Sequence, residues 1–77
     1  METLVLARTK EILLGHLRGV GADGTPAVVS VYKAGRDYRI THGDKRHLCH
    51  PSVRGIPKVK AEAMLVFHVS QASFEAL

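Results

Sequence analysis

The sequence predicts one α+β domain over residues 1–77, with a small single mixed sheet and two or three short helices. Three observations predict it. Apolar residues recur with helical spacing between residues 9 and 20, and two β-forming runs, 27–31 and 37–41, are close enough to form a hairpin. The third observation is the length, because 77 residues provide one thin core and bury only about 60% of the unfolded surface.

The first half of the chain is expected to form a strand, a helix and a hairpin. Residues 3–7 are a short apolar run that predicts a strand, and Thr9 can cap the helix that follows. Gly15 would cost this helix about 1 kcal/mol relative to Ala, which is acceptable where a neighbouring element approaches closely. A glycine-rich loop then leads to the hairpin, whose alternation predicts that Val29 and Val31 lie against the partner strand's Tyr38 and Ile40.

The second half is expected to alternate helix, strand and helix. Gly43 or Asp44 can start a helix that Pro51 must end within two turns. In residues 59–69 every second residue, starting from Val59, is apolar, so an extended chain would present one apolar face, which favours a strand. Ser70 can cap a last helical turn or two, and the predicted order is therefore β-α-β-β-α-β-α.

The composition limits the classes of protein to which the chain can belong. With 45% hydrophobic and 23% charged residues, it is too apolar for intrinsic disorder. A domain of this length has little room for a deep multi-substrate active site beside its core. Lys and Arg number 11 against 7 Asp and Glu, a formal charge of +4, which favours an anionic partner such as nucleic acid or a nucleotide.

Cysteine usage and hydropathy predict the compartment. Cys49 is the single cysteine, so an internal disulfide is excluded, and this is typical of a reducing environment. No apolar run approaches the roughly 20 residues that span a bilayer, and the start of the chain lacks the basic region of a secretory signal. We therefore expect a cytoplasmic protein with no membrane partner.

The densest group of polar residues lies between His42 and His50, and it predicts a phosphate site. A glycine at a helix N-terminus lets a phosphate approach free backbone N–H groups, and the helix dipole favours the negative charge. Gly43, Lys45 and Arg46 would form this site, with the Arg46 guanidinium matching the geometry of a phosphate. The alternative is a solvated turn with no ligand.

Several short motifs follow one another between about residues 12 and 69: Pro26-Ala27-Val28-Val29, Tyr38-Arg39-Ile40, His42-Gly43-Asp44-Lys45-Arg46, Arg54-Gly55-Ile56 and Val59. Their order and spacing resemble the ParB/sulfiredoxin-like domain, and the resemblance implies a minimal version of this fold. In that family the segment matching Gly43 to Arg46 holds nucleotide phosphates, CTP in partition proteins and ATP in sulfiredoxin and a kinase branch, and some relatives are nucleases.

Two departures limit what the resemblance implies. Sulfiredoxins carry their catalytic cysteine where this chain has Asp44, while Cys49 lies further along, so sulfinic acid reduction is not supported. Partition proteins need a further nucleotide motif and a DNA-binding domain that 77 residues cannot hold. Whether the chain is an enzyme stays open: as a nuclease or nucleotide hydrolase, it would use Asp44 as the catalytic residue and Mg²⁺ with ATP or CTP. Asp44 could equally be a plain helix cap.

Basic residues also suggest direct nucleic-acid binding. Eight of the eleven fall between positions 33 and 60, and such a surface would follow a phosphate backbone with affinity that weakens steeply with salt. Tyr32 and Tyr38 could stack on bases, although tyrosines in a hairpin more often pack across strands. The residues assigned to this surface are Arg36, Arg39, Arg54, Lys58 and Lys60.

Three other interpretations of the sequence carry less support. His42, His47, Cys49 and His50 are possible zinc ligands, but they lie too close in sequence to join two elements, so no metal is predicted. Cys49 and His50 are neighbours that would point in different directions on a helix, which argues against a nucleophilic pair. The remaining alternative is a non-enzymatic small basic protein that docks on a protein partner through residues 65–69 or 74–77.

Overall fold

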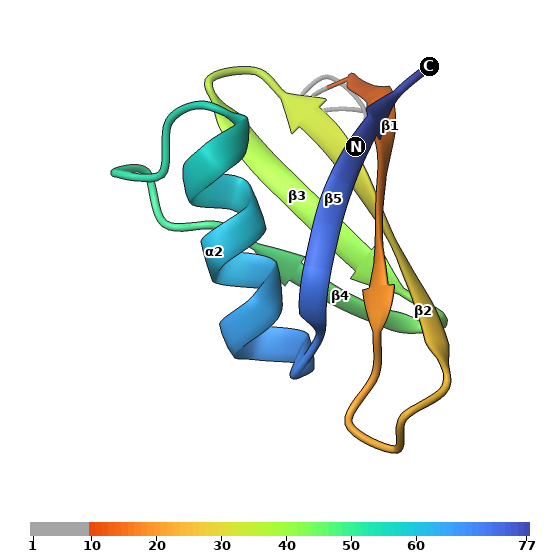
Figure 1. The fold of residues 1–77 in the computed structure, drawn as a ribbon. Coiled ribbons are helices and arrows are strands. Elements are labelled where there is room, and N and C mark those ends of the chain that lie inside the picture. Colours follow the sequence, from red (N-terminus) through yellow and green to blue (C-terminus); the bar gives the residue numbers. More distant parts are fainter. Residues whose placement is uncertain (1–9) are drawn as a thin grey trace.

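The computed structural model describes residues 10–77, which form a five-stranded antiparallel sheet and one helix (Figure 1). The strand order is β4-β3-β2-β1-β5, so the last strand of the chain pairs with the first. The helix connects β4 to β5 and contacts β5 and β3. The elements are β1 (Glu11–Val20), β2 (Pro26–Ala34), β3 (Asp37–His42), β4 (Lys45–Leu48), α2 (Ile56–Phe67) and β5 (Ser70–Ala76).

Two tight turns join β2, β3 and β4 into a meander. Gly35 and Arg36 connect Ala34 to Asp37, and Gly43 and Asp44 connect His42 to Lys45. In each turn the glycine comes first and has a positive φ, 63° and 65°, while the residue after it does not. This is the pattern of a type II′ turn, whose twist matches that of the flanking strands and which requires glycine at its first central position.

One face of the sheet and one face of α2 form the core. Val29, Val31 and Ile40 are fully buried, with Val31 directly opposite Ile40, as the predicted hairpin alternation requires. From the helix, Val59 and Ala63 pack against them one turn apart. No polar or charged side chain is buried among residues 10–77. The complete core is Leu17, Ala27, Val29, Val31, Ile40, Cys49, Val53, Val59, Ala63 and Val69.

Strand β5 lies unusually close to β1, in a way that two glycines permit. A Cβ at Gly15 would collide with the backbone oxygen of Glu75 and lie 2.8 Å from Phe74 Cζ. A Cβ at Gly19 would lie 2.8 Å from Val69 Cγ1 and 2.5 Å from the Ser70 oxygen. Glycine within a strand often marks such an approach of another backbone. The absence of side chains at these positions lets β5 pack across β1 and complete the sheet.

The predicted mixed sheet with two or three short helices is wrong for residues 10–77. The expected helix over residues 9–20 is strand β1, because its backbone pairs with β2 on one side and β5 on the other. Its apolar spacing fits both structures, but Gly15 and Gly19 serve the approach of β5 rather than a helix. The strand predicted at residues 3–7 lies outside the described residues.

Two further predicted elements, the helix after Gly43 and the strand over residues 59–69, have a different secondary structure. The helix expected from Gly43 or Asp44 is the β3–β4 turn and strand β4, because a glycine with positive φ reverses the chain there. The strand expected over residues 59–69 is helix α2 and its exit. Residues 59, 63 and 67 share a face in a strand and also, at four-residue intervals, in a helix. Ala61 and Leu65, which only a strand would place with them, are exposed.

The last predicted helix, over residues 70–77, is strand β5. Phe74 lies opposite Leu17 of β1 and packs against the core, and the Leu77 N–H donates a hydrogen bond to the Leu14 oxygen at 3.1 Å. A segment this short gains more from completing a sheet than from an isolated helical turn, which is unstable without tertiary contacts. Among the described residues, the β2–β3 hairpin is the one predicted pairing of elements that the structure confirms.

Candidate functional site

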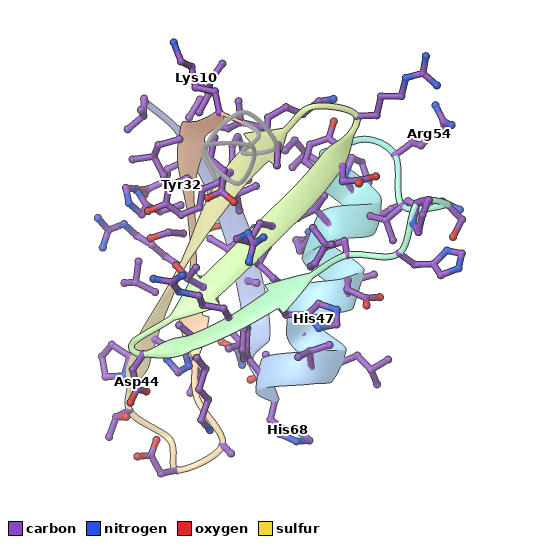
Figure 2. The ribbon with its side chains drawn as sticks, turned by 180° about the vertical axis from the view of Figure 1, so that it is seen from behind. Lys10, Tyr32, Asp44, His47, Arg54 and His68 are labelled. Carbon is purple, nitrogen blue, oxygen red and sulfur yellow. The ribbon has the colours of Figure 1, made fainter. Side chains whose placement is uncertain are left out.

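Two opposite ends of the molecule carry candidate functional residues (Figure 2). Arg54 and Lys10 lie at one end, where α2 begins and β2 turns into β3, and Asp44 and His68 lie at the other. The second end also holds a pocket. We call the first end the basic end, defined by Lys33, Arg36, Arg54 and Lys58. The pocket at the second end, defined by its lining residues in the next paragraph, is called the mouth pocket.

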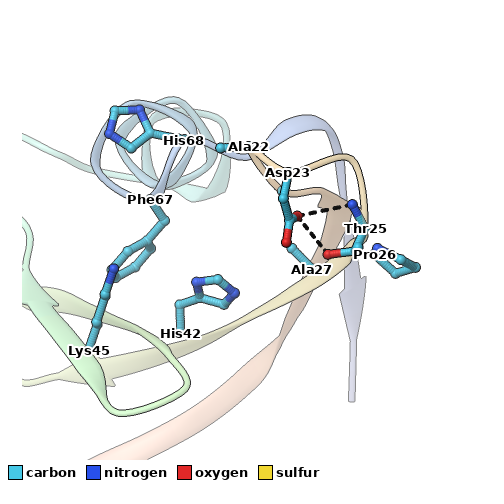
Figure 3. A pocket seen from close by; sticks show the side chains of 10 residues that line it. Ala22, Asp23, Thr25, Pro26, Ala27, His42, Lys45, Phe67 and His68 are labelled. Atoms are coloured by element: carbon cyan, nitrogen blue, oxygen red, sulfur yellow. Dashed lines mark hydrogen bonds between the residues drawn. The ribbon is translucent and has the colours of Figure 1, made fainter.

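The mouth pocket has a volume of about 490 Å³ and is shared by three segments (Figure 3). The β1–β2 loop and the first two residues of β2 form one wall, through Gly21, Ala22, Asp23, Thr25, Pro26 and Ala27. His42 and Lys45, which face each other across the β3–β4 turn, form another, and Phe67 and His68 close it from the end of α2. The His42 and Phe67 rings contact each other, with centroids 5.6 Å apart and planes tilted by 55°. The size is within the range of about 300–1,000 Å³ of small-molecule sites.

Asp23 supplies the carboxylate that lines this pocket, and this carboxylate accepts hydrogen bonds from Thr25 of the same loop. Its Oδ1 accepts hydrogen bonds from the Thr25 hydroxyl at 2.7 Å and the Thr25 N–H at 3.1 Å (Figure 3). These bonds, the hydroxyl first, hold the pKa of Asp23 below its usual value. The carboxylate is therefore ionised at neutral pH and fixes the shape of the loop, with Oδ2 left for a further donor.

The basic end collects cations from three parts of the chain. Arg36 is in the β2–β3 turn, Arg54 is in the loop before α2, and Lys58 is in the first turn of that helix; all three are exposed. Lys33 holds its ammonium 4.6 Å from the centre of the Tyr38 ring. None of these four side chains has a carboxylate oxygen within 4 Å among residues 10–77.

Elsewhere in the described chain, carboxylates pair with cations and reduce the local charge. Arg18 Nε lies 2.6 Å from Glu75 Oε1, and Arg39 Nε lies 2.6 Å from Glu11 Oε2. The Arg39 side chain as a whole is 30% exposed, but its Nε atom is buried. Because the Nε–H is not aligned with the Glu11 oxygen, this atom has no hydrogen-bond acceptor. Arg39, predicted as a nucleic-acid contact, is therefore held by Glu11 on the helix-free face of the sheet, apart from the basic end.

The predicted phosphate site does not assemble as the sequence suggested. Its premise was a helix N-terminus at Gly43, and the structure has a hairpin turn there. Lys45 and Arg46 are consecutive in strand β4, so their side chains point to opposite faces. Lys45 lines the mouth pocket, while Arg46 lies opposite Thr41 on the helix-free face. Asp44, the predicted catalytic residue, is exposed in the turn.

Of the other predicted nucleic-acid contacts, Arg36, Arg54 and Lys58 are exposed around the β2–β3 turn and the start of α2, which Figure 1 shows at the same end of the molecule. Lys60 is half-buried further along α2. Tyr38 packs against the core, while Tyr32 lies opposite Arg39 on the helix-free face. Of the segments suggested for protein docking, Leu65 is 74% and Leu77 78% exposed, but Phe74 and Val69 belong to the packed interior.

Cys49 and the nearby histidines form no reactive or metal-binding group among the described residues. The Cys49 N–H donates to the Tyr38 oxygen at 2.8 Å, and its side chain is buried. Burial, with a smaller effect of the Glu62 charge, raises the thiol pKa to about 11, so little thiolate forms at neutral pH. His47 Nε2 lies 2.8 Å from Glu62 Oε2. Within residues 10–77, no three His, Cys, Asp or Glu side chains gather as metal ligands.

Comparisons with known proteins leave the family open. No family model, curated protein or solved structure matches the chain, so nothing there identifies a ParB/sulfiredoxin-like domain. The helix of residues 10–77, α2, is not long and apolar enough to cross a membrane. The evidence for function is therefore the chemistry of the two ends of the molecule.

Sequence reasoning missed the mouth pocket because its residues come from separated segments. Asp23, His42 and Phe67 carry no common motif, and Phe67 was placed in a strand. The one local signal was the pair Gly43-Asp44 between two short β-forming runs, which is a hairpin signature. Recognising it would have placed His42 opposite Lys45.

Proposed function

We propose that the protein binds nucleic acid through phosphate contacts at the basic end. The observation that supports this most is the segregation of charge: Lys33, Arg36, Arg54 and Lys58 converge from three segments without a carboxylate partner among the described residues. Cations that are left unpaired at one end of a small domain attract a polyanion more strongly than the total charge of +4 suggests.

The start of helix α2 adds to this positive potential. Its N-cap is Gly55, which makes no side-chain capping hydrogen bond, and its first turn contains no acidic residue. The N–H groups of Ile56 and Lys58 are therefore not satisfied by a side-chain cap, while Pro57 has no N–H to offer. The positive end of the helix dipole has the same sign as Arg54 and Lys58. The carboxylate closest in sequence to Arg36 is Asp37, which makes no ion pair in the described residues.

Contacts of this kind position a backbone and carry little sequence information. Arg36 and Arg54 can each donate two parallel hydrogen bonds to a phosphate, whereas Lys58 acts as a point charge. Lys33 is held over the Tyr38 ring, which limits its motion without neutralising it. We therefore expect binding that is similar for different base sequences and that depends strongly on salt.

The experiment measures fluorescence anisotropy of labelled single-stranded and duplex oligonucleotides, without terminal phosphates, over a range of salt concentrations. Four phosphate contacts predict a slope of log K against log salt of about −3 for a single strand, from ~0.7 per contact. The double variant Arg36→Gln/Arg54→Gln should make this slope shallower by about 0.7 for each contact removed, to about −1.4.

The matched control is Arg18→Gln/Arg46→Gln, which removes two charges from exposed side chains on the helix-free face. This variant has the same net charge as the test variant and should bind with a slope close to that of the unmodified protein. Equal losses in the two variants would mean that net charge alone drives binding. That result, or no binding at low salt, would refute an interface at the basic end.

A further inference from the structure

The mouth pocket lies at the opposite end from the basic end, and nothing in the comparisons assigns a ligand to it. Its lining includes the contacting rings of His42 and Phe67, both of which are half-buried. Both rings therefore keep some exposed surface, and Figure 3 shows them beside each other among the residues of the pocket. A planar ring can stack there, since aromatic pairs prefer offset or tilted contacts at centroid distances of about 4.5–7 Å.

The rim of the pocket carries one cation and one carboxylate. Lys45 is exposed at one side of it. His42 and His68 can donate from their ring nitrogens. Asp23, the acidic side chain at this rim, has one carboxylate oxygen taken by two bonds from Thr25. Lys45 is therefore the group at this rim that can hold an anion, and Asp23 Oδ2 can accept from a donor group of the same ligand.

We propose that the mouth pocket binds a nucleoside 5′-monophosphate, either free or as the 5′-phosphorylated end of a strand. The base stacks on the exposed surface of Phe67 and His42, the phosphate accepts from Lys45, and an exocyclic amino group or ribose hydroxyl donates to Asp23 Oδ2. This assignment does not rest on the proposed function, because the two sites share no residue. It also differs from the sequence prediction, in which Lys45 and Arg46 acted together from a helix N-terminus.

The experiment is a titration followed by two-dimensional NMR of the backbone amides. The probes are AMP, GMP, CMP and UMP, a trinucleotide with and without a 5′-phosphate, and adenosine and inorganic phosphate alone. We expect saturable shifts at His42, Lys45 and Phe67 with the monophosphates, and weaker binding of adenosine or phosphate alone. Tighter binding of the phosphorylated trinucleotide than of any mononucleotide would identify a strand end as the source, and the reverse order would identify the free nucleotide.

Two variants at adjacent positions of β4 test the role of the pocket side chain. Lys45→Gln should weaken monophosphate binding about tenfold or more, the loss expected for one hydrogen bond to a charged group. Arg46→Gln removes the same charge from the next residue, on the other face of the sheet, and should leave the affinity unchanged. Equal weakening in both variants, shifts confined to Arg36 and Arg54, no saturable shifts, or equal binding of phosphate alone would each overturn the proposal.

Discussion

The two strands that flank β1 are held to it in different ways. Strand β2 follows β1 after a short loop and pairs with it along nearly its whole length, with one irregularity between Leu13 and Gly15. Strand β5 comes from the end of the chain, has a shifted register between Arg18 and Val20, and lies where Gly15 and Gly19 leave room for it. The first pairing follows from local sequence, whereas the second depends on two missing side chains.

The largest effect is expected from placing a side chain at the β1–β5 contact. Gly15→Ala would put a methyl group into the Glu75 backbone oxygen and 2.9 Å from Ala76 Cα, and backbone cannot move aside as a flexible side chain can. Overpacking of this kind costs about 3 kcal/mol. Chemical denaturation should show this loss in the free energy of unfolding, and hydrogen exchange should show that the β5 amides lose more protection than those of β3.

Gly21→Ala is the matched control for this substitution. Gly21 follows β1 directly and has no positive φ. Its new Cβ would lie 3.3 Å from Asp23 Oδ1, which Thr25 holds by two hydrogen bonds but which belongs to a side chain and not to the backbone of a paired strand. We expect a change within about 0.5 kcal/mol, as for ordinary surface positions. Similar losses at Gly15 and Gly21 would contradict the view that the close approach of β5 is what requires glycine.

The difference between the two pairings also explains how much of the fold could be predicted. The β2–β3 hairpin was predictable because Val29, Val31 and Ile40 alternate within a few residues of their turn. β5 was not, because its partner β1 is far away in sequence, and such tertiary pairing overrides local propensity. β1 was missed although its partner β2 is close in sequence, because its apolar spacing also fits a helix. Gly15 was accepted only as a cost to that helix, whereas in the structure it leaves room for β5.

The candidate functional residues also differ in how far the sequence could predict their arrangement. Five basic residues were predicted as one nucleic-acid surface from their charge and clustering. In the structure, three are exposed around the β2–β3 turn and the start of α2, whereas Arg39 pairs with Glu11 and Lys60 is half-buried. The three exposed residues are Arg36, Arg54 and Lys58. Lys45 and Arg46 were predicted to act together because a helix would have presented both. In a strand their side chains point to opposite faces of the sheet. Charge alone could therefore single out the residues of the predicted phosphate site, but the arrangement of their side chains depends on the secondary structure.

A smaller loss is expected when a turn glycine of the meander is replaced. Gly43 has a φ of 65° and its Cβ would meet nothing within 4 Å, so Gly43→Ala changes backbone strain without any collision. A non-glycine residue in this region costs about 1–2 kcal/mol. Thermal unfolding should show a smaller decrease in Tm than for Gly15→Ala. A loss equal to that of Gly15→Ala would mean that the local turn and the distant contact limit stability equally.

The smallest effect is expected from the ion pair that also joins β1 to β5. Arg18 and Glu75 are paired at 2.6 Å, but their side chains remain 57% and 58% exposed, so water and salt screen the attraction. A double-mutant cycle with Arg18→Gln and Glu75→Gln should give a coupling of about 0.5 kcal/mol or less, measured by chemical denaturation. A coupling several times larger would show that charge, and not the close approach allowed by Gly15 and Gly19, fixes β5 on the sheet. Because the pair is exposed, the coupling should also decrease as salt is added, whereas the cost of Gly15→Ala should not.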